Sequence, residues 1–361
     1  MTTRIGLIAT ATTTFEEPYN LARRFASLDL ISQGRAGWNM VTTSAEAAAA
    51  NFGRTMPSPE ERYARGEEFL DVVLGLWRGW REDAIVADRD TGVWGDPDRI
   101  RPLRHRGEHF QVEGPLTVGR SRQGHPVVVQ AGSSGPGVAL AAKYAEAVFT
   151  AQRSVVEGRA FYDRLKALTV KAGRNPDHVK ILPGIVPVLG GTEAEARAAE
   201  KQLDDLVVLD YPLQQLAAQT GLPVAELALD EPLPQGVREV HEIVGSRARY
   251  ELTLNLARSE NLTVRELLLR LGGGRGHRTF VGTPEQVADD LEEWFTAGAA
   301  DGFNVMPPVL PQGLDAFVDH VVPILQRRGL FRTEYAGSTL REHYGLPVPA
   351  SVVGDGVSQA G

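Results

Sequence analysis

Residues 126–137 read PVVVQAGSSGPG, and this segment decides the class of fold. Its apolar run is continuous from Val127 to Val129, whereas a strand with one wet face would alternate apolar and polar residues. Continuous apolar runs are typical of parallel strands that are buried on both faces. The glycines that follow permit a tight turn, after which Ser133 or Ser134 can begin a helix. The segment therefore predicts a buried strand, a turn and a helix.

The same alternation of strand and helix continues through the chain. Five further apolar runs predict parallel strands at 4–10, 36–42, 146–151, 179–190 and 301–306, with amphipathic stretches between them. This order predicts a parallel α/β fold, either a doubly wound sheet or a closed TIM (β/α)8 barrel. We expect one domain over residues 1–346.

Short sequence patterns predict the first residue of two helices. Ser58, Pro59 and Glu61 form the pattern of a capping box with proline at the first helical position, and an apolar face follows from Tyr63 to Trp77. Residues 283–286 (TPEQ) repeat the pattern, and Val287, Leu291, Trp294 and Phe295 are expected to face inward.

Residues 205–275 interrupt this rhythm. They contain the proline-rich stretch EPLPQG (231–236), two short helical patterns and the start of the glycine-rich loop GGGRG (272–276), which we interpret as a hinge. We expect an insertion on the barrel rim that acts as a lid. Residues 347–361 lack periodicity and are expected to be a disordered tail.

The sequence contains fewer predicted strands than a complete TIM barrel requires. Six strands are recognised, whereas a (β/α)8 barrel needs eight, and the first run begins only three residues after Met1. At roughly 30 residues per βα unit, the deficit equals about 60 residues. We therefore expect the first two βα units to be missing, which would leave an unpaired strand edge.

Composition narrows the class of function. The 361 residues are 42% hydrophobic and 23% charged, with a formal net charge of −8 and no cysteine. An acidic chain is not typical of nucleic-acid binding, and the absence of cysteine excludes disulfides and thiolate chemistry. No apolar run approaches the ~20 residues that span a bilayer, and the N-terminal run is too short for a signal peptide. We expect a cytoplasmic protein that contacts neither nucleic acid nor membrane.

Polar side chains follow several predicted strands, where a TIM barrel carries its active site. Residues 10–14 (TATTT) and Asn39 with its following threonines either cap turns or face a ligand, and Trp38 is expected in the core. Ser133 and Ser134 are open to the same two interpretations, a helix cap or a phosphate site. The eight histidines show no metal-binding spacing, and no GxSxG elbow or GxGxxG fingerprint is present.

Several long blocks resemble one family. They are RIGLIATATTTFEEPYNLARRFASLDLISQGRAGWNMVTT (4–43), ERYARGEEFLDVVLGLW (61–77), HPVVVQAGSSGPG (125–137) and GHRTFVGTPEQVADDLEEWF (276–295). They are similar to the nitrilotriacetate monooxygenase component A family of the bacterial-luciferase superfamily, which also acts on dibenzothiophene sulfone, EDTA and dimethyl sulfide. The resemblance covers residues 4–346 and implies a TIM barrel that binds FMN at the carboxyl ends of its strands.

The resemblance also implies which residues contact the cofactor. By matching position, Thr10 and Asn39 line the flavin pocket, Tyr63 lies near the flavin phosphate, and the phosphate loop contains Gly132, Ser133 and Ser134. The sequence departs from the family at Pro59, where a histidine is usual, and nothing in it matches the family's first two βα units. The residues that carry out catalysis are not assigned.

The implied reaction uses reduced FMN from a separate NAD(P)H-dependent flavin reductase and O2 to oxidise a small organic substrate. The flavin supplies the chemistry while the protein binds it and excludes water. Two alternatives stay open: a deazaflavin-dependent oxidoreductase, and a non-catalytic flavin-binding protein. The resemblance further implies a homo-oligomer, a dimer or a tetramer.

Overall fold

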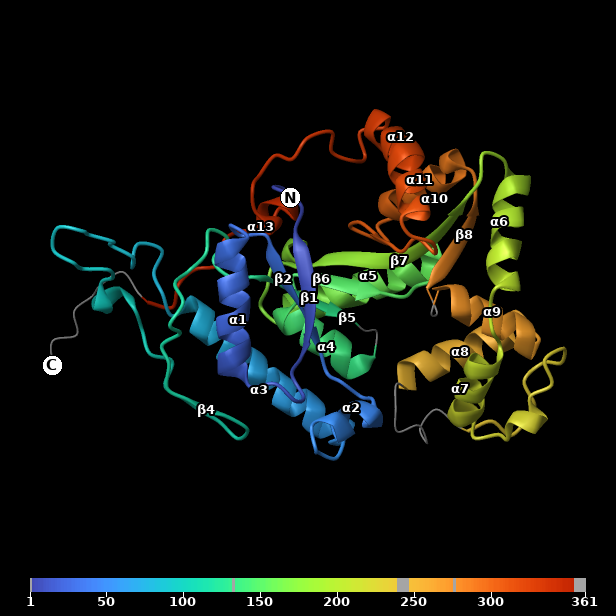
Figure 1. Ribbon diagram of the computed structural model, residues 1–361, viewed down its shortest axis with the longest axis horizontal. Helices are drawn as coiled ribbons and strands as arrows, with labels where there is room; N and C mark the ends of the chain where they lie inside the picture. The colour runs from blue at the N-terminus through green and yellow to red at the C-terminus, as the bar shows by residue number, and fades with distance from the viewer. Residues whose placement is uncertain (1, 132–133, 239–246, 275–276, 354–361) are drawn as a thin grey trace.

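The structure is a computed structural model that describes residues 2–131, 134–238, 247–274 and 277–353. Strands and helices alternate along most of these ranges (Figure 1). Every strand pair of the main sheet is parallel. Its strands follow the order β1 (Leu7–Thr12), β2 (Ala36–Val41), β5 (Val127–Ala131), β6 (Ala147–Thr150), β7 (Lys180–Leu189) and β8 (Arg278–Gly282), and β9 (Asn304–Val305) also pairs with β7. The fold is a TIM-barrel-like parallel α/β fold.

The six predicted strands are all present, but the prediction missed β8. Its sequence, RTFVG, begins with two polar residues, and its first four residues are only half-buried. A search for continuous apolar runs therefore passes over it. The strand is ordered by parallel pairing with the distal half of β7, from Ile185 to Leu189.

The prediction that the first strand is buried on both faces is wrong. Leu7 is 68% exposed and Ile8 is 41% exposed. In the described part of the chain, β1 pairs with β2 alone, so one edge and much of its surface lack a covering element. Apolar composition predicted the strand but could not predict its neighbours.

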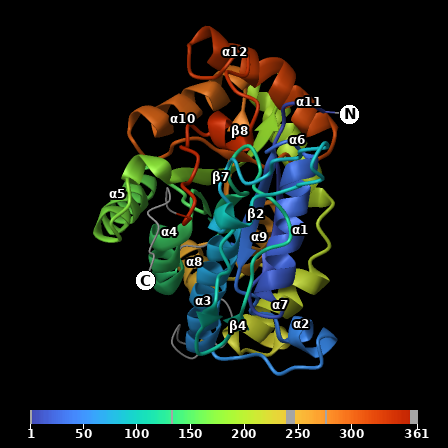
Figure 2. The same cartoon turned by 90° about the vertical axis from the view of Figure 1, so that its left-hand side faces the viewer.

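Helices cover the outer side of the sheet. The longest ones are α1 (Pro18–Ile31), α3 (Pro59–Arg78) and α5 (Val155–Lys171), and Figure 2 shows α1 and α3 side by side next to β2. Trp38 and Met40 of β2 are fully buried against these helices, as expected for Trp38. Other helices are α2 (Glu46–Asn51), α4 (Gly135–Tyr144), α6 (Glu193–Asp205), α10 (Pro284–Thr296), α11 (Gln312–Ala316), α12 (Val322–Arg327) and α13 (Leu340–His343). A small hairpin pairs β3 (His105–Arg106) with β4 (Gln111–Val112).

Both predicted helix starts are confirmed. Ser58 caps α3 and Thr283 caps α10, and each forms a complete capping box with the residue three positions later. Val287, Leu291 and Trp294 are buried as predicted. The prediction for Phe295 is wrong because its ring is 48% exposed. No helix in the described ranges is both long enough and apolar enough to cross a membrane.

The inner side of the sheet is filled at its amino end. Val127, Val129 and Leu182 form a cluster there with Leu340 and Leu346 from the C-terminal part of the chain. A Cβ atom on Gly37 of β2 would lie 2.9 Å from Ile8 and 3.2 Å from Leu340, so glycine permits this close packing. This cluster fills the barrel at the amino ends of the strands, so the interior is accessible from their carboxyl ends.

The described residues within 205–275, which are 205–238 and 247–274, form a helical group beside the carboxyl ends, at the lower right of Figure 1. It contains α7 (Asp210–Thr220), α8 (Arg247–Ser259) and α9 (Val264–Gly274). The group has an apolar core of its own, to which Leu216, Leu256 and Leu267 belong. The glycine-rich loop differs from its prediction, since its first three glycines end α9, while residues 275 and 276 lie outside the described residues.

The predicted tail falls partly within the described ranges. The Ser351 hydroxyl and the Val352 amide both donate to the carbonyl oxygen of Arg78, which places this stretch against the end of α3. Residues 354–361 lie outside the described residues.

Candidate functional site

Thr10 and Asn39 form a pair on neighbouring strands. The two residues are register partners in β1 and β2, and the Asn39 amide donates to the Thr10 hydroxyl at 3.0 Å. The Asn39 Oδ1 atom is shielded from solvent and accepts no hydrogen bond from any residue that the structure describes. A shielded amide oxygen without a donor is costly in a protein and marks a position where a ligand can supply the donor.

The threonines that follow β1 have a different role. The Thr43 hydroxyl donates to Thr12 at 2.8 Å, and the backbone amide of Thr14 donates to the Thr12 hydroxyl at 3.1 Å. Of the two interpretations open for this run, the structure supports the turn for Thr12. Thr10 remains the member that is paired with Asn39.

Tyr63 and Ser134 meet at the first turn of α4. The Tyr63 hydroxyl of α3 lies 3.1 Å from the Ser134 hydroxyl, and Ser134 is the N-cap of α4, accepting from the Gly137 amide at 3.3 Å. The first turn of α4 contains no acidic residue. Hydroxyl groups at a helix N-terminus without nearby carboxylates suit an anion. Gly132 and Ser133, the other predicted members of this loop, lie outside the described residues.

Gln130 belongs to the same corner and was missed by the sequence analysis. It is 5% exposed, and its Oε1 atom is shielded from solvent and has no hydrogen-bond donor within the described ranges. A Cβ atom on Gly137 would lie 3.0 Å from the Ser134 hydroxyl and 3.4 Å from both Gln130 and Tyr63. Glycine therefore keeps this corner open. The signal available in the sequence was a polar residue inside an otherwise apolar strand.

His277 and Phe149 form a second pair that sequence reasoning did not find. Their rings stack with centroids 4.7 Å apart and an angle of 8° between planes. A Cβ atom on Gly184 of β7 would lie 2.5 Å from His277, so the imidazole packs directly on the strand backbone. Phe149 is the register partner of Ala131, the last residue of β5. The imidazole therefore lies near the strand ends that carry Ser134.

A hollow of about 730 Å³, lined by both polar and apolar residues, adjoins these strand ends. One wall is the loop after β6 with the start of α5, and the other is α8. Burial lowers the pKa of Arg153 in this hollow, while Glu260 and Glu157 oppose the effect. The lining includes Gln152, Arg153, Ser154, Glu157, Asn255 and Ser259. The 205–275 group thus forms part of the wall.

Pro59 is the first residue of α3, one turn before Tyr63. Proline fits this helical position because its missing amide would have no partner there. Its side chain can neither donate nor accept a proton. Among the described residues, no group of three or more histidine, aspartate and glutamate side chains could hold a metal ion.

Comparison with known proteins identifies the family of this chain. Residues 1–301 match the luciferase-like monooxygenase family. The chain is 48% identical to N-acetyl-S-(2-succino)cysteine monooxygenase of Bacillus subtilis, over 97% of this chain and 80% of that protein. It is 49% identical to nitrilotriacetate monooxygenase component A of Aminobacter aminovorans, over 98% of this chain and 78% of that protein. The family resemblance inferred from the sequence is confirmed.

One solved structure that is similar to this chain was determined with a flavin. Riboflavin lyase RcaE, solved with modified FMN and riboflavin, superposes with a TM-score of 0.83 at 32% identity, over 97% of this chain and 76% of that one. A coenzyme F420-dependent tetrahydromethanopterin reductase from Methanopyrus kandleri superposes with a TM-score of 0.55 at 15% identity, over 90% and 84% of the two chains. The second likeness concerns the fold alone.

Proposed function

Because the chain belongs to the luciferase-like monooxygenase family, we propose that it is the FMN-dependent oxygenase component of a two-component system. It takes reduced FMN from a separate NAD(P)H-dependent flavin reductase and uses O2 to oxidise a small organic substrate. The observation that carries the proposal is the pairing of Tyr63 with Ser134 at the acid-free start of α4. The name of one relative, component A, supports the division of labour between two proteins.

The residues at the strand ends fit FMN. The phosphate is held by Ser134 and Tyr63, together with Gly132 and Ser133 of the same loop. Charge-assisted hydrogen bonds from hydroxyl groups at a helix start suit a dianion. Asn39 supplies an amide oxygen that needs a donor, and an N–H group of the flavin ring is such a donor. Thr10 fixes the orientation of the Asn39 amide.

Bound reduced flavin supplies the reaction with O2, and the chain's own residues supply position and shelter. The 205–275 group acts as the lid, because α8 already forms one wall of the hollow at the strand ends. A closed lid excludes water, which would otherwise divert reduced oxygen to peroxide. Pro59 carries no proton, so we assign any proton transfer at this site to His277.

The substrate proposal rests on the hollow beside the strand ends. Among the described residues, the Arg153 guanidinium makes no hydrogen bond or ion pair, and burial lowers its pKa although the Glu260 and Glu157 charges oppose this. A carboxylate on the substrate would stabilise this cation. The two relatives named above act on nitrilotriacetate and on N-acetyl-S-(2-succino)cysteine, which both carry carboxylates. We propose a small organic acid as substrate.

The test supplies photoreduced FMN to the purified protein in buffer with 18O2 and either of these two acids. The expected result is one labelled oxygen atom per molecule of product, and tighter binding of FMN than of coenzyme F420. Peroxide formation without labelled product for a panel of organic acids would contradict the proposed activity and favour a non-catalytic flavin-binding protein. Tighter binding of F420 would favour the deazaflavin alternative. We also propose that the protein is cytoplasmic and that it forms a homo-oligomer. Sedimentation of the purified protein measures the size of the oligomer.

A further inference from the structure

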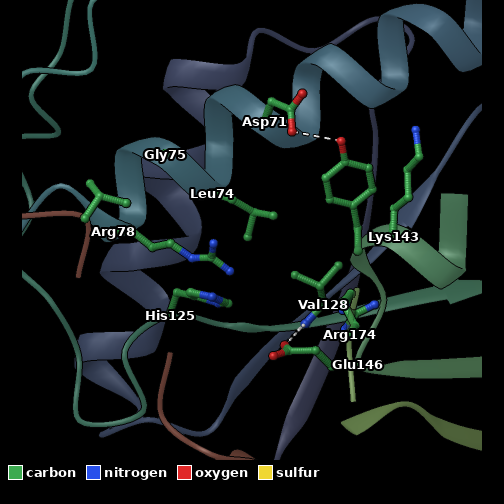
Figure 3. Close-up of a pocket in the computed structure, with 11 residues that line it drawn as sticks. Asp71, Leu74, Gly75, Arg78, His125, Val128, Lys143, Glu146 and Arg174 are labelled. Carbon is green, nitrogen blue, oxygen red and sulfur yellow. Dashed lines mark hydrogen bonds between the residues drawn. The ribbon is translucent and has the colours of Figure 1, made fainter. Parts of the chain in front are cut away.

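A second cavity lies at the opposite end of the barrel from Tyr63 and Ser134. Its volume is about 400 Å³, and it opens between α3, α4 and the amino ends of β5 and β6 (Figure 3). His125 and Glu146, which line it, directly precede these two strands. In TIM barrels this end serves stability and does not carry the reaction. A cavity here therefore needs an explanation apart from the oxygenase site.

One carboxylate in this cavity, that of Glu146, is hydrogen-bonded to a buried arginine. Arg341, which is 1% exposed, donates to both of its oxygens, and the Val128 amide donates to Oε2 at 3.0 Å. Burial alone would raise the pKa of Glu146, but the Arg341 charge and these hydrogen bonds hold it below its usual range. Glu146 is therefore bound to Arg341, and among the described residues no hydrogen bond joins it to Arg78.

Two more guanidinium groups face the same carboxylate. Arg174 is held by the end of α4, donating to the carbonyl oxygens of Ala142 at 2.9 Å and Ala145 at 2.8 Å. Arg78, the last residue of α3, makes no hydrogen bond or ion pair through its side chain in the described ranges, and its Nε atom is shielded from solvent. Figure 3 shows its guanidinium directed into the cavity beside His125.

The other groups of the cavity leave the Arg78 charge unbalanced. Burial lowers the pKa of His125 to about 3, so this ring is neutral and adds no charge. Asp71 on the far wall accepts from the uncharged Tyr144 hydroxyl at 2.8 Å, and Lys143 is paired with Glu67. The three guanidinium groups of Arg78, Arg174 and Arg341 therefore outnumber the remaining carboxylates, Glu146 and Asp71, by one. A partly buried cation without a partner is unfavourable, and a bound anion would relieve the cost.

We propose that this cavity binds a small oxyanion group, a phosphate or a carboxylate, through the Arg78 guanidinium. Arg174 and Arg341 add positive potential from the same side and favour the anion. The apolar side chains of Leu74 and Val128 line the remaining space, which is larger than inorganic phosphate requires. An anion with a short apolar portion therefore fits better than a bare ion.

The test measures the midpoint of thermal unfolding as inorganic phosphate or hexanoate is added at constant ionic strength and pH 7.5. Assuming a Kd of ~1 mM, a 10 mM concentration should raise the Tm by about 1–3 °C. Comparing the rise in Tm caused by phosphate with that caused by hexanoate shows which of the two oxyanion groups the cavity prefers. A larger shift with hexanoate supports the organic anion, and a larger shift with phosphate supports a phosphate group.

Three variants locate the effect. Arg78→Gln should abolish the shift, whereas Arg89→Gln, which removes an exposed cation elsewhere, should retain it. Ser134→Ala should also retain it, because the anion lies at the opposite end of the barrel from the proposed FMN phosphate. If neither anion shifts the wild-type Tm, or if Arg78→Gln shifts as much as wild type, the proposal is wrong. If Arg78→Gln does not fold, the Arg78→Lys variant takes its place in the test. A rise in Tm that is about half the wild-type rise, or less, supports the site, and a full wild-type rise contradicts it.

Discussion

The hydroxyl oxygens of Tyr63 and Ser134 lie 3.1 Å apart although the residues are 71 positions apart in the chain. Either hydroxyl can donate to the other, and the one that accepts keeps its own hydrogen for a further acceptor. The contact joins the helix before β5 to the helix after it. It thereby fixes two hydroxyl groups at the place where the family resemblance puts the flavin phosphate.

Replacing Ser134 with alanine should weaken FMN binding. One hydrogen bond to a charged group contributes about 1.5–3 kcal/mol, so the Kd should rise by roughly 10- to 100-fold. Tyr63→Phe should act in the same direction. Titration of FMN fluorescence measures both affinities.

The control for this prediction is Thr192→Ala, which removes the N-cap hydroxyl of α6. Both Ser134→Ala and Thr192→Ala lose a helix cap, at a cost of about 1 kcal/mol in folding free energy. Only the former should lose FMN affinity. Equal affinities in the two variants would remove Ser134 from the phosphate site.

Asn39→Ala should separate stability from function. The variant loses the hydrogen bond to Thr10, worth about 0.5–1.5 kcal/mol, but also removes a shielded amide oxygen without a donor, a cost of about 1–3 kcal/mol. The free energy of unfolding should therefore stay level or rise. Product formed per reduced FMN should fall, because the group that orients the flavin is gone. A large loss of stability with unchanged product yield would show that Asn39 is purely structural.

His125 should make the protein sensitive to acid. Burial lowers its folded-state pKa from 6.5 to about 3, so between these values the unfolded chain binds a proton that the folded chain does not. The stability contributed by neutral His125 is complete above pH 6.5 and falls as the pH drops toward 3, by ~1.4 kcal/mol per pH unit. Urea unfolding at pH 4.5, 5.5 and 6.5 measures this slope.

A histidine variant assigns the slope to His125. His125→Leu removes the titrating group and should reduce the slope by about one proton. His320→Leu removes an exposed histidine and should leave the slope unchanged. If both variants keep the wild-type slope, a group other than His125 causes the acid sensitivity.

The proposed lid should be the first part of the chain to be cleaved. Residues 221–238 follow α7 and carry mostly exposed side chains, with Arg238 as a trypsin site. Cleavage in 205–275 should precede cleavage elsewhere, and saturating FMN should slow it if the lid closes over the flavin. Mass spectrometry of the early fragments identifies the site. Early cleavage within β5 or β6, or a rate that FMN leaves unchanged, would contradict the lid.

Much of the fold could be predicted from local sequence. The run VVV at 127–129, and the other apolar runs like it, predicted six strands, because a parallel strand buried on both faces needs apolar side chains in both directions. Ser58 and Thr283 marked the first turns of α3 and α10, since capping depends on residues only three positions apart. The polar start of β8 carries no such local signal, and the strand was missed.

The candidate site was only partly accessible in this way. Thr10, Asn39, Tyr63 and Ser134 were found through the family resemblance, while Gln130 and His277 were not found. The stacking of His277 on Phe149 joins residues from distant segments, and Gly184 permits it. No spacing along the chain encodes such a contact.

The sequence by itself determined the class of fold, the helix starts and the family, because these depend on short patterns and on long blocks of matching residues. Only the tertiary structure decided that Leu7 is exposed, that the Arg78 side chain has no hydrogen-bond or ion-pair partner among the described residues, and that Tyr63 meets Ser134. Burial and pairing are properties of the neighbours that packing brings together. The same apolar or charged residue is therefore satisfied in one packing arrangement and left unpartnered in another.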